Sequence, residues 1–304
     1  MRVWISVSIF KSVYRVLRIV LVVAAIFGMA YQGRIKEDFE NYKMRAIPAL
    51  MYHSISGVPE GWPADLCIAP EVFEEHLKYL QARGYNVITA PQAMILLKSR
   101  QNVMNTVILT FDDGYENNYT EAFPLLKKYG FRGNFYIVGN DVGKTKNQDG
   151  VKKYMTYGQI KQMHDQGMEI GSHSMSHDPL TSIKPDMLPW EIYQPLNLFY
   201  EKMGFWISGI AFPNGAFNDT IVAEVRKYFK YEYGFSGIAG CNTLKIVTET
   251  PFALRRAGVY DRGNGVKDIE TVLQKCYVFA YLEEKGVPVY LLDKGKRLLQ
   301  MFPG

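Results

Sequence analysis

The chain contains little cysteine, and its few cysteines are far apart. Its 304 residues include only Cys67, Cys241 and Cys276. Disulfide frameworks and zinc knuckles use more cysteines and place them in close pairs. We therefore expect three buried thiols, of which at most one pair could form a disulfide.

The main body of the chain also lacks runs of lysine and arginine. The formal net charge is +5, but the first 33 residues hold four basic residues and no acidic one: Arg2, Lys11, Arg15 and Arg18. Subtracting these four from +5 leaves +1 for the remainder. A nearly neutral body argues against the broad positive surface by which proteins bind nucleic acid, so we predict no nucleic-acid partner.

Those four basic residues precede an uncharged and mostly apolar run, residues 19–31. The run is short for a membrane span and about right for the apolar core of a signal sequence, with small residues at 28–30 offering a cleavage position. A helix that extends back toward Val13 could instead anchor the chain in the membrane. Residues 1–33 are therefore expected to be a signal or an anchor, and the body to be exported. A buried amphipathic helix is the alternative.

Strands and helices alternate along the rest of the chain. Strands are predicted at 47–52, 85–88, 107–111, 134–138, 168–170, 207–212, 233–235 and 253–259, and helices at 70–84, 91–98, 120–129, 157–166, 185–203, 220–229 and 266–275. Such repeats imply parallel strands with right-handed crossovers, hence a barrel or a doubly wound sheet. We expect one α/β domain at 46–276, after an exposed charged linker at 34–45 and before an extension of unknown role at 277–304.

Two adjacent acids end the predicted strand at 107–111. Asp112 and Asp113 are followed by Gly114. Because side chains alternate along a strand, the two acids can share one task only if the chain turns there, which the glycine permits. Two like charges this close also predict a nearby cation, since one acid would otherwise take up a proton. The alternative is an ordinary surface loop.

The chain has only five histidines, and two of them follow the predicted strand at 168–170. His173 and His177 lie four residues apart in the sequence GSHSMSH. On a helical turn this spacing places both imidazoles on one face, where they can bind one metal ion together. With a carboxylate from the other strand end, they leave coordination positions open for water and substrate, as catalytic metal sites do.

Taken together, TFDDG at 110–114 and HSMSH at 173–177 resemble the first two motifs of the polysaccharide deacetylases with a NodB homology domain, carbohydrate esterase family 4. The stretches IPALMYHSIS, PEVFEEHLKYLQARGYNVIT and FPNGAFN are also similar to that family, so the resemblance covers about residues 47–275. It implies a single distorted (β/α) barrel, a divalent metal and the removal of acetyl groups from N-acetylated sugars. The metal is usually zinc, although Co²⁺ and Ni²⁺ also suit such ligands. The resemblance further implies that Asp113, His173 and His177 hold the metal and that Asp112 is the general base.

The third motif departs from the commonest pattern of the family. Ala211 stands where many members have an arginine that orients the catalytic aspartate, and Asn214 where many have an aromatic residue. The backbone N–H of Asn214 could still stabilise an oxyanion. Either Arg255 or Arg256 could supply the cation, because a similar arginine occurs in the branch of the family that acts on exported β-1,6-glucosamine polysaccharide; the other arginine would face solvent.

A second departure concerns the general acid. Many family members carry a Leu-x-His segment near the carboxyl end, but residues 288–295 contain no histidine. His53, at the end of the first predicted strand, is the replacement we expect to protonate the leaving amine; alternatively it is a core residue. His76 and His164 lie within predicted helices and are interpreted as helix-surface residues.

These observations predict an exported, metal-dependent deacetylase of a polysaccharide or oligosaccharide that contains N-acetylglucosamine. One alternative is a non-catalytic carbohydrate-binding protein on the same fold, because the motif-three arginine and the terminal histidine are absent. Another is a deacylase of a lipid-linked sugar, suggested by the membrane-proximal amino end. The loops at 54–70 and 139–155 contain no pattern that selects among chitin fragments, peptidoglycan and poly-N-acetylglucosamine.

Overall fold

The computed structural model describes residues 32–147, 149–228 and 230–287. The chain divides into two compact units, residues 1–42 and 43–304. Within the first unit the described residues are helical, so the linker predicted at 34–45 is largely helix. The predicted apolar segment at 19–31 and the tail from 288 lie outside the described residues. In the part of the chain that is described, no helix is long and apolar enough to cross a membrane.

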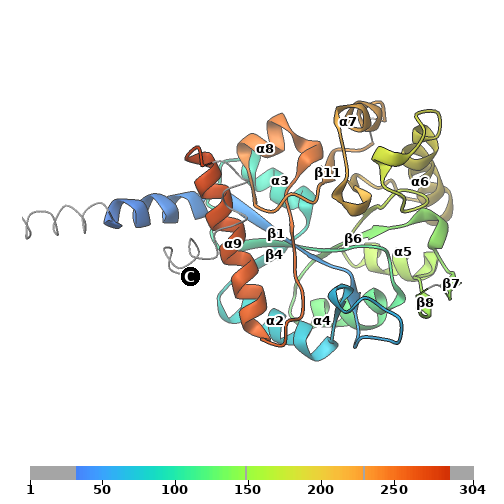
Figure 1. Ribbon diagram of the computed structural model, residues 1–304, viewed down its shortest axis with the longest axis horizontal. Coiled ribbons are helices and arrows are strands. Elements are labelled where there is room, and N and C mark those ends of the chain that lie inside the picture. The colour runs from blue at the N-terminus through green and yellow to red at the C-terminus, as the bar shows by residue number, and fades with distance from the viewer. Residues whose placement is uncertain (1–31, 148, 229, 288–304) are drawn as a thin grey trace, which may run out of the picture. The chain divides into compact units, whose positions relative to one another are not determined.

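A nine-stranded sheet forms the centre of the second unit (Figure 1). Its path runs β11-β10-β9-β6-β5-β1-β12, with β4 beside β5 and β13 beside β1. All neighbouring strands are parallel except β1 and β12. The strands are β1 (Ala46–Tyr52), β4 (Asn86–Ile88), β5 (Thr106–Phe111), β6 (Gly133–Ile137), β9 (Glu169–Ser172), β10 (Gly209–Ala211), β11 (Tyr233–Phe235), β12 (Cys241–Thr243) and β13 (Ala257–Gly258).

One end of this path, β11, is linked to β1 by the segment that leads into β13. Phe235 at the end of β11 forms a parallel bridge with Leu254, and the backbone N–H of Ser236 donates to the Leu254 carbonyl at 2.9 Å. Three residues later β13 pairs with β1. The segment 254–258 therefore connects β11 back to β1. The predicted distorted (β/α) barrel is confirmed.

Helices connect the strands and surround them in Figure 1. They are α2 (Pro70–Ala82), α3 (Ala90–Lys98), α4 (Phe123–Lys128), α5 (Tyr157–Asp165), α6 (Leu188–Met203), α7 (Asp219–Arg226), α8 (Leu244–Glu249) and α9 (Val266–Glu284). Thr89 and Thr156 each begin a helix with a reciprocal capping box, in which the threonine and a glutamine three residues later bond to each other's backbone N–H groups. The predicted alternation of strand and helix is confirmed.

The structure differs from the prediction in several elements. The helix expected at 120–129 begins with a π-helical turn, Asn118–Ala122, before α4. Of the strand expected at 253–259, only β13 forms. The loop after β6 contains two short hairpin strands, β7 (Thr145–Lys146) and β8 (Lys152–Lys153), and a further short pair, β2 (Ser54–Ile55) and β3 (Cys67–Ile68), was not predicted. Helix α9 does not end near 275 but continues to Glu284.

The interpretation of His76 as a helix-surface residue is wrong. Its side chain is fully buried on the face of α2 that also buries Phe73 and Leu80. Nδ1 lies 3.2 Å from the Tyr52 hydroxyl, and Nε2 lies 3.4 Å from the Gly265 carbonyl oxygen. His76 therefore joins β1 and the start of α9 from inside the molecule.

The other expectations for thiols and histidines agree with the structure. All three cysteines are buried and free. His164 is partly exposed on α5, where its ring stacks on Phe205 with a centroid separation of 3.6 Å.

Candidate metal centre and active site

The turn after β5 aims two carboxylates into one place. Strand β5 ends at Phe111, and Asp113 and Gly114 both adopt left-handed backbone conformations with φ of 71° and 79°. A non-glycine residue rarely adopts this conformation, and functional sites are where such strain concentrates. Seven described non-glycine residues have positive φ, and four of them belong to this site: Asp113, Ser174, His177 and Asn214. The turn lets both aspartates face the same centre.

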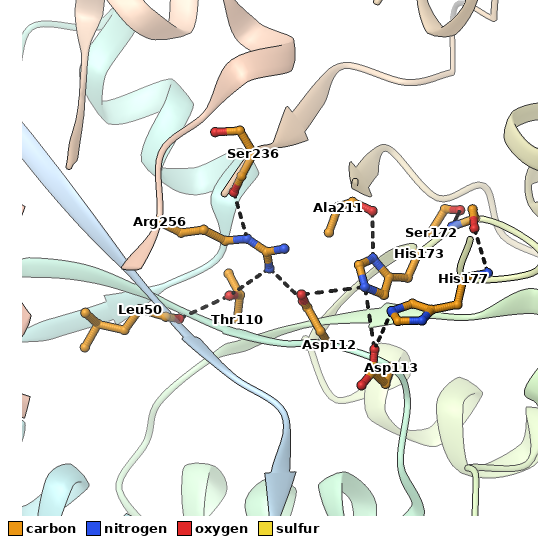
Figure 2. Close-up of polar contacts among 11 residues, drawn as sticks. Leu50, Thr110, Asp112, Asp113, Ser172, His173, His177, Ala211, Ser236 and Arg256 are labelled. Carbon is orange, nitrogen blue, oxygen red and sulfur yellow. Dashed lines mark hydrogen bonds and ion pairs between the residues drawn. The ribbon is translucent and has the colours of Figure 1, made fainter. Parts of the chain in front are cut away.

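The two histidines come from the loop that follows β9. His173 is buried, His177 is partly exposed, and their ring centroids are 4.9 Å apart. The backbone N–H of His177 donates to the Ser174 hydroxyl at 3.0 Å, which closes the loop between them. Both imidazoles approach the Asp113 carboxylate, as Figure 2 shows.

Asp113, His173 and His177 form a cluster with the composition of a metal site. One ligand atom from each residue lies within 4.8 Å of the others. Asp113 Oδ1 is 3.1 Å from His177 Nε2 and 3.6 Å from His173 Nε2. Although it is buried, this oxygen accepts no hydrogen bond among the described residues. A buried carboxylate oxygen without a donor, facing two imidazole nitrogens, fits a divalent cation.

A backbone carbonyl selects the tautomer of His173. Nδ1 lies 2.7 Å from the Ala211 carbonyl oxygen at the end of β10. Because a carbonyl can only accept, Nδ1 carries the proton and Nε2 keeps its lone pair toward Asp113. Burial lowers the pKa of His173 to about 4, despite the nearby aspartates. The imidazole is therefore neutral near neutral pH, as a metal ligand must be.

The pKa values of the two remaining charged members depend on each other. Burial alone raises the pKa of Asp113, but the close approach of His177 and the charge of His53 outweigh it, so this pKa lies below its usual range. For His177, burial lowers the pKa, but the carboxylates of Asp113, Asp112 and Asp141 together outweigh burial, so the pKa is raised. The carboxylates around His177 therefore favour its protonated form.

Asp112 has a different partner from its neighbour. Its Oδ1 accepts a hydrogen bond from Arg256 Nη1 at 2.6 Å (Figure 2). Both side chains are almost completely buried. Its other oxygen, Oδ2, lies 3.7 Å from His173 Nε2. Burial raises the pKa of Asp112, but Arg256 together with His173 and His53 outweighs burial, so the pKa falls below its usual value. Asp112 is consequently an ionised carboxylate held beside the candidate metal ligands.

The structure distinguishes the two candidate arginines. Arg256 is buried; besides Asp112 it contacts the Ser236 carbonyl at 3.2 Å and the Thr110 hydroxyl at 3.3 Å. Arg255 points the other way and forms an ion pair with Glu283 on α9. The cation that the two adjacent acids predicted is therefore Arg256. Arg255 was expected to face solvent, but it is paired with Glu283 instead.

His53 and Asn214 lie at the same end of the barrel. The N–H of Asp112 donates to the Tyr52 carbonyl at 3.0 Å, which places the carboxyl ends of β1 and β5 side by side. The charge of His53 lowers the pKa of both aspartates, in keeping with this placement. Asn214, exposed, occupies a turn three residues beyond Ala211, whose carbonyl contacts His173.

One polar residue near this site was not predicted. Asn118 is fully buried, and its Nδ2 donates to the His53 carbonyl oxygen at 2.7 Å. It lies in the π-helical turn after the Asp-Asp-Gly sequence. A polar residue a few positions beyond a motif is too weak a signal to select it without the structure, because most such residues face solvent.

Comparisons with known proteins agree with this geometry. The family model described as polysaccharide deacetylase matches residues 99–233. YxkH of Bacillus subtilis, assigned to the polysaccharide deacetylases, is 30% identical over 237 residues, 76% of each chain. The peptidoglycan-N-acetylmuramic acid deacetylase PdaA of the same organism is 32% identical over 124 residues, which cover 40% of this chain and 43% of PdaA.

A solved structure supports the fold independently. The deacetylase PplD of Streptococcus pyogenes superposes with a TM-score of 0.66 over 75% of this chain and 97% of its own, at 23% identity. That identity is low enough that only the fold is inferred from it. The similarity to YxkH is stronger evidence, because it extends along three quarters of both sequences at 30% identity. It confirms the resemblance seen in the motifs: the chain belongs to the polysaccharide deacetylases, carbohydrate esterase family 4, which hydrolyse amide bonds.

Proposed function

We propose that this enzyme removes acetyl groups from N-acetylglucosamine units of a polysaccharide or oligosaccharide outside the cytoplasm, with a divalent metal, preferentially Zn²⁺, held by Asp113, His173 and His177. The observation that carries the proposal is the ionised Asp112, paired with Arg256 at 2.6 Å and next to the three candidate ligands without belonging to their cluster. A binding protein has no need for a base in that position.

The side chains suit a hydrolytic division of roles. When bound, a divalent cation supplies Lewis acidity that polarises the amide carbonyl and lowers the pKa of water. Asp112 accepts the proton of the attacking water, while Arg256 keeps that carboxylate ionised and fixes its direction. His53 donates a proton to the departing amine, and the backbone N–H of Asn214 donates to the developing oxyanion.

The proposed substrate class follows from the family and from its named members. PdaA is named for deacetylation of N-acetylmuramic acid in peptidoglycan, and the chain matches 43% of its length. Both peptidoglycan and poly-N-acetylglucosamine present the acetamido group that the site would hydrolyse. Export is proposed from the basic and apolar residues of the amino end. It fits the proposed substrates, because such polymers lie outside the cytoplasm.

Acetate release from purified full-length protein tests the function. The polymers to screen are acetylated chito-oligosaccharides, peptidoglycan, poly-β-1,6-N-acetylglucosamine and a lipid-linked N-acetylated sugar. We expect release from at least one polymer, loss of release with a chelator, and recovery when Zn²⁺ is returned. A metal-loaded protein that releases acetate from none of these substrates would contradict the proposal.

Two substitutions separate the roles of the adjacent aspartates. Asp112→Asn should lower kcat by about 10²- to 10⁴-fold while zinc remains bound, as expected for loss of a general base. Asp113→Ala should instead lower zinc affinity. Zinc content and acetate release are measured on the same samples. Equal zinc loss in both variants would remove the distinction between ligand and base.

A further inference from the structure

A buried glutamate on α6 contacts the loop that carries both histidines. Glu191 is only 3% exposed, and its Oε2 accepts hydrogen bonds from two successive backbone N–H groups, those of Met175 and Ser176, each at 3.0 Å. These two residues lie between His173 and His177. The carboxylate therefore reaches the centre of the segment that separates the two candidate metal ligands.

The other backbone donors of this loop have local or strand partners. His173 donates to Ile137 on β6, and the remaining three N–H groups donate to serine hydroxyls two or three residues earlier: Ser174 to Ser172, His177 to Ser174, and Asp178 to Ser176. Glu191 is thus the side chain from outside the loop that satisfies two of its six consecutive donors. Without it, the N–H of the buried Met175 would lose its partner.

The loop needs such support because its backbone is strained. Ser174 and His177 have φ of 61° and 71°, in the left-handed region that costs an L-residue about 1 to 2 kcal/mol each. Conformations of this kind persist only where surrounding contacts hold them. Two hydrogen bonds to a carboxylate are stronger than bonds to neutral acceptors, and Glu191 lies in the first turn of α6, where the helix dipole favours its negative charge.

We propose that Glu191 is a positioning residue for the metal centre: it holds the turn at 174–176 so that the imidazoles of His173 and His177 both face Asp113. This inference rests on the proposed function, because it assumes that these three residues bind a metal ion. Residues that orient metal ligands in this way typically change metal affinity or activity by about 10- to 100-fold when they are replaced.

Zinc affinity, measured by competition with a chromophoric chelator, tests the inference without an activity assay. We expect Glu191→Ala to weaken zinc binding about 10- to 100-fold. Glu191→Gln should give a smaller loss in the same direction, because its amide oxygen can accept but carries no charge. Glu201→Ala is the matched control, since Glu201 is exposed on the same helix, and its zinc affinity should equal that of the wild type.

A second readout separates positioning from general stabilisation. The rise in Tm on adding zinc should shrink in both Glu191 variants, whereas a purely structural role would lower the Tm of the metal-free and zinc-loaded proteins equally. If Glu191→Ala does not fold, Glu191→Gln decides, and unchanged zinc affinity in it overturns the inference. Wild-type zinc affinity in Asp113→Ala and His177→Ala would show instead that the proposed metal centre itself is wrong.

Discussion

Arg256 and Asp112 form a buried ion pair whose two members depend on each other. Both side chains are at most 3% exposed, and their charged atoms are 2.6 Å apart. Removing one member of a buried pair leaves an uncompensated charge and typically costs about 3 to 5 kcal/mol. Arg256→Met should therefore lower both the free energy of unfolding and kcat. Urea denaturation and acetate release measure the two effects.

Two further variants make this prediction specific. Arg255→Met removes a partly exposed pair with Glu283 and should cost about 1 kcal/mol or less, with little effect on kcat. The double variant Asp112→Asn, Arg256→Met should recover much of the lost stability, because the uncompensated charge is gone, but no activity. Equal free energies of unfolding for Arg256→Met and Arg255→Met would contradict the prediction that the buried pair contributes more to stability than the partly exposed one.

The two arginines illustrate how far residue-scale reasoning extends from the sequence. Adjacent residues on an extended segment point to opposite sides, so the pattern predicted that one arginine would face inward but not which one. The register of 254–258 against β11 and β1 decides this, and register is a tertiary property. For His76 the signal was present: it lies three residues after Phe73 and four before Leu80, the spacing of one helical face.

Glu169, which is not one of the candidate metal ligands, makes the stability of the protein depend on pH. Burial raises the pKa of its carboxyl from its usual value of 4.5 to about 7, although Ser208 and Tyr233 donate hydrogen bonds to it. The pKa of Glu169 is higher in the folded protein than in the unfolded chain. Its contribution to the free energy of unfolding is therefore fully present below about pH 4.5 and is lost as the pH rises to about 7. Above that pH the loss is complete.

Glu169→Gln should remove this dependence. The Tm of the variant minus that of the wild type should increase as the pH rises from 5 to 8. The amide keeps an oxygen that accepts from Ser208 and Tyr233, and it has no charge to desolvate. Thermal unfolding of the metal-free proteins across that range measures the difference. Glu201→Gln, at an exposed site, should track the wild type at every pH. A constant Tm difference across the range would contradict the assignment.

At the scale of elements, the turn after β10 depends on a close approach of two glycines. Gly215 follows Asn214 and has φ of 66°; a Cβ built on it would lie 2.4 Å from both the Cα and the N of Gly237. Backbone atoms cannot move aside as a flexible side chain can. Gly215→Ala should therefore displace the Pro213–Gly215 turn and reduce both stability and kcat.

Gly204 provides the matched control for this substitution. It ends α6 with φ of 80°, but a Cβ there meets nothing within 4 Å. Gly204→Ala should cost only the conformational penalty of about 1 kcal/mol, with kcat unchanged. Urea denaturation separates the two effects, because Gly215→Ala includes the same penalty plus the clash. Equal losses in both variants would mean that the turn can relax.

Elements were predicted well where the pattern is local and less well where pairing decides them. The strands that end at the site, β5 and β9, lie directly before the polar motifs that mark them in the sequence, and both are within two residues of the predicted bounds. By contrast, β12 pairs antiparallel with β1 across about 195 residues, as Ile47 opposite Asn242 shows. The sequence pattern of β12 alone does not predict that its partner is a strand so far away in the chain.

At the scale of the whole molecule, α9 completes the barrel domain rather than following it. The predicted domain ended at 276, but α9 continues to Glu284 and packs against β1, β12, β13 and α2. Its second half buries five side chains: Cys276, Tyr277, Val278, Ala280 and Tyr281. The sequence prediction ended the helix at Lys275, whereas the burial of the residues that follow is a property of the packed barrel.

A truncation series tests this role of α9. Burying these five side chains contributes on the order of 5 to 10 kcal/mol, which is comparable to the 5 to 15 kcal/mol that separates most folded domains from their unfolded states. A chain that ends at Lys275 should therefore lack a cooperative thermal transition and bind no zinc. A chain that ends at Val287 keeps all of α9 and should retain a cooperative transition and zinc binding. Circular dichroism melting compares them directly, and a cooperative, zinc-binding chain ending at Lys275 would place the domain boundary back at 276.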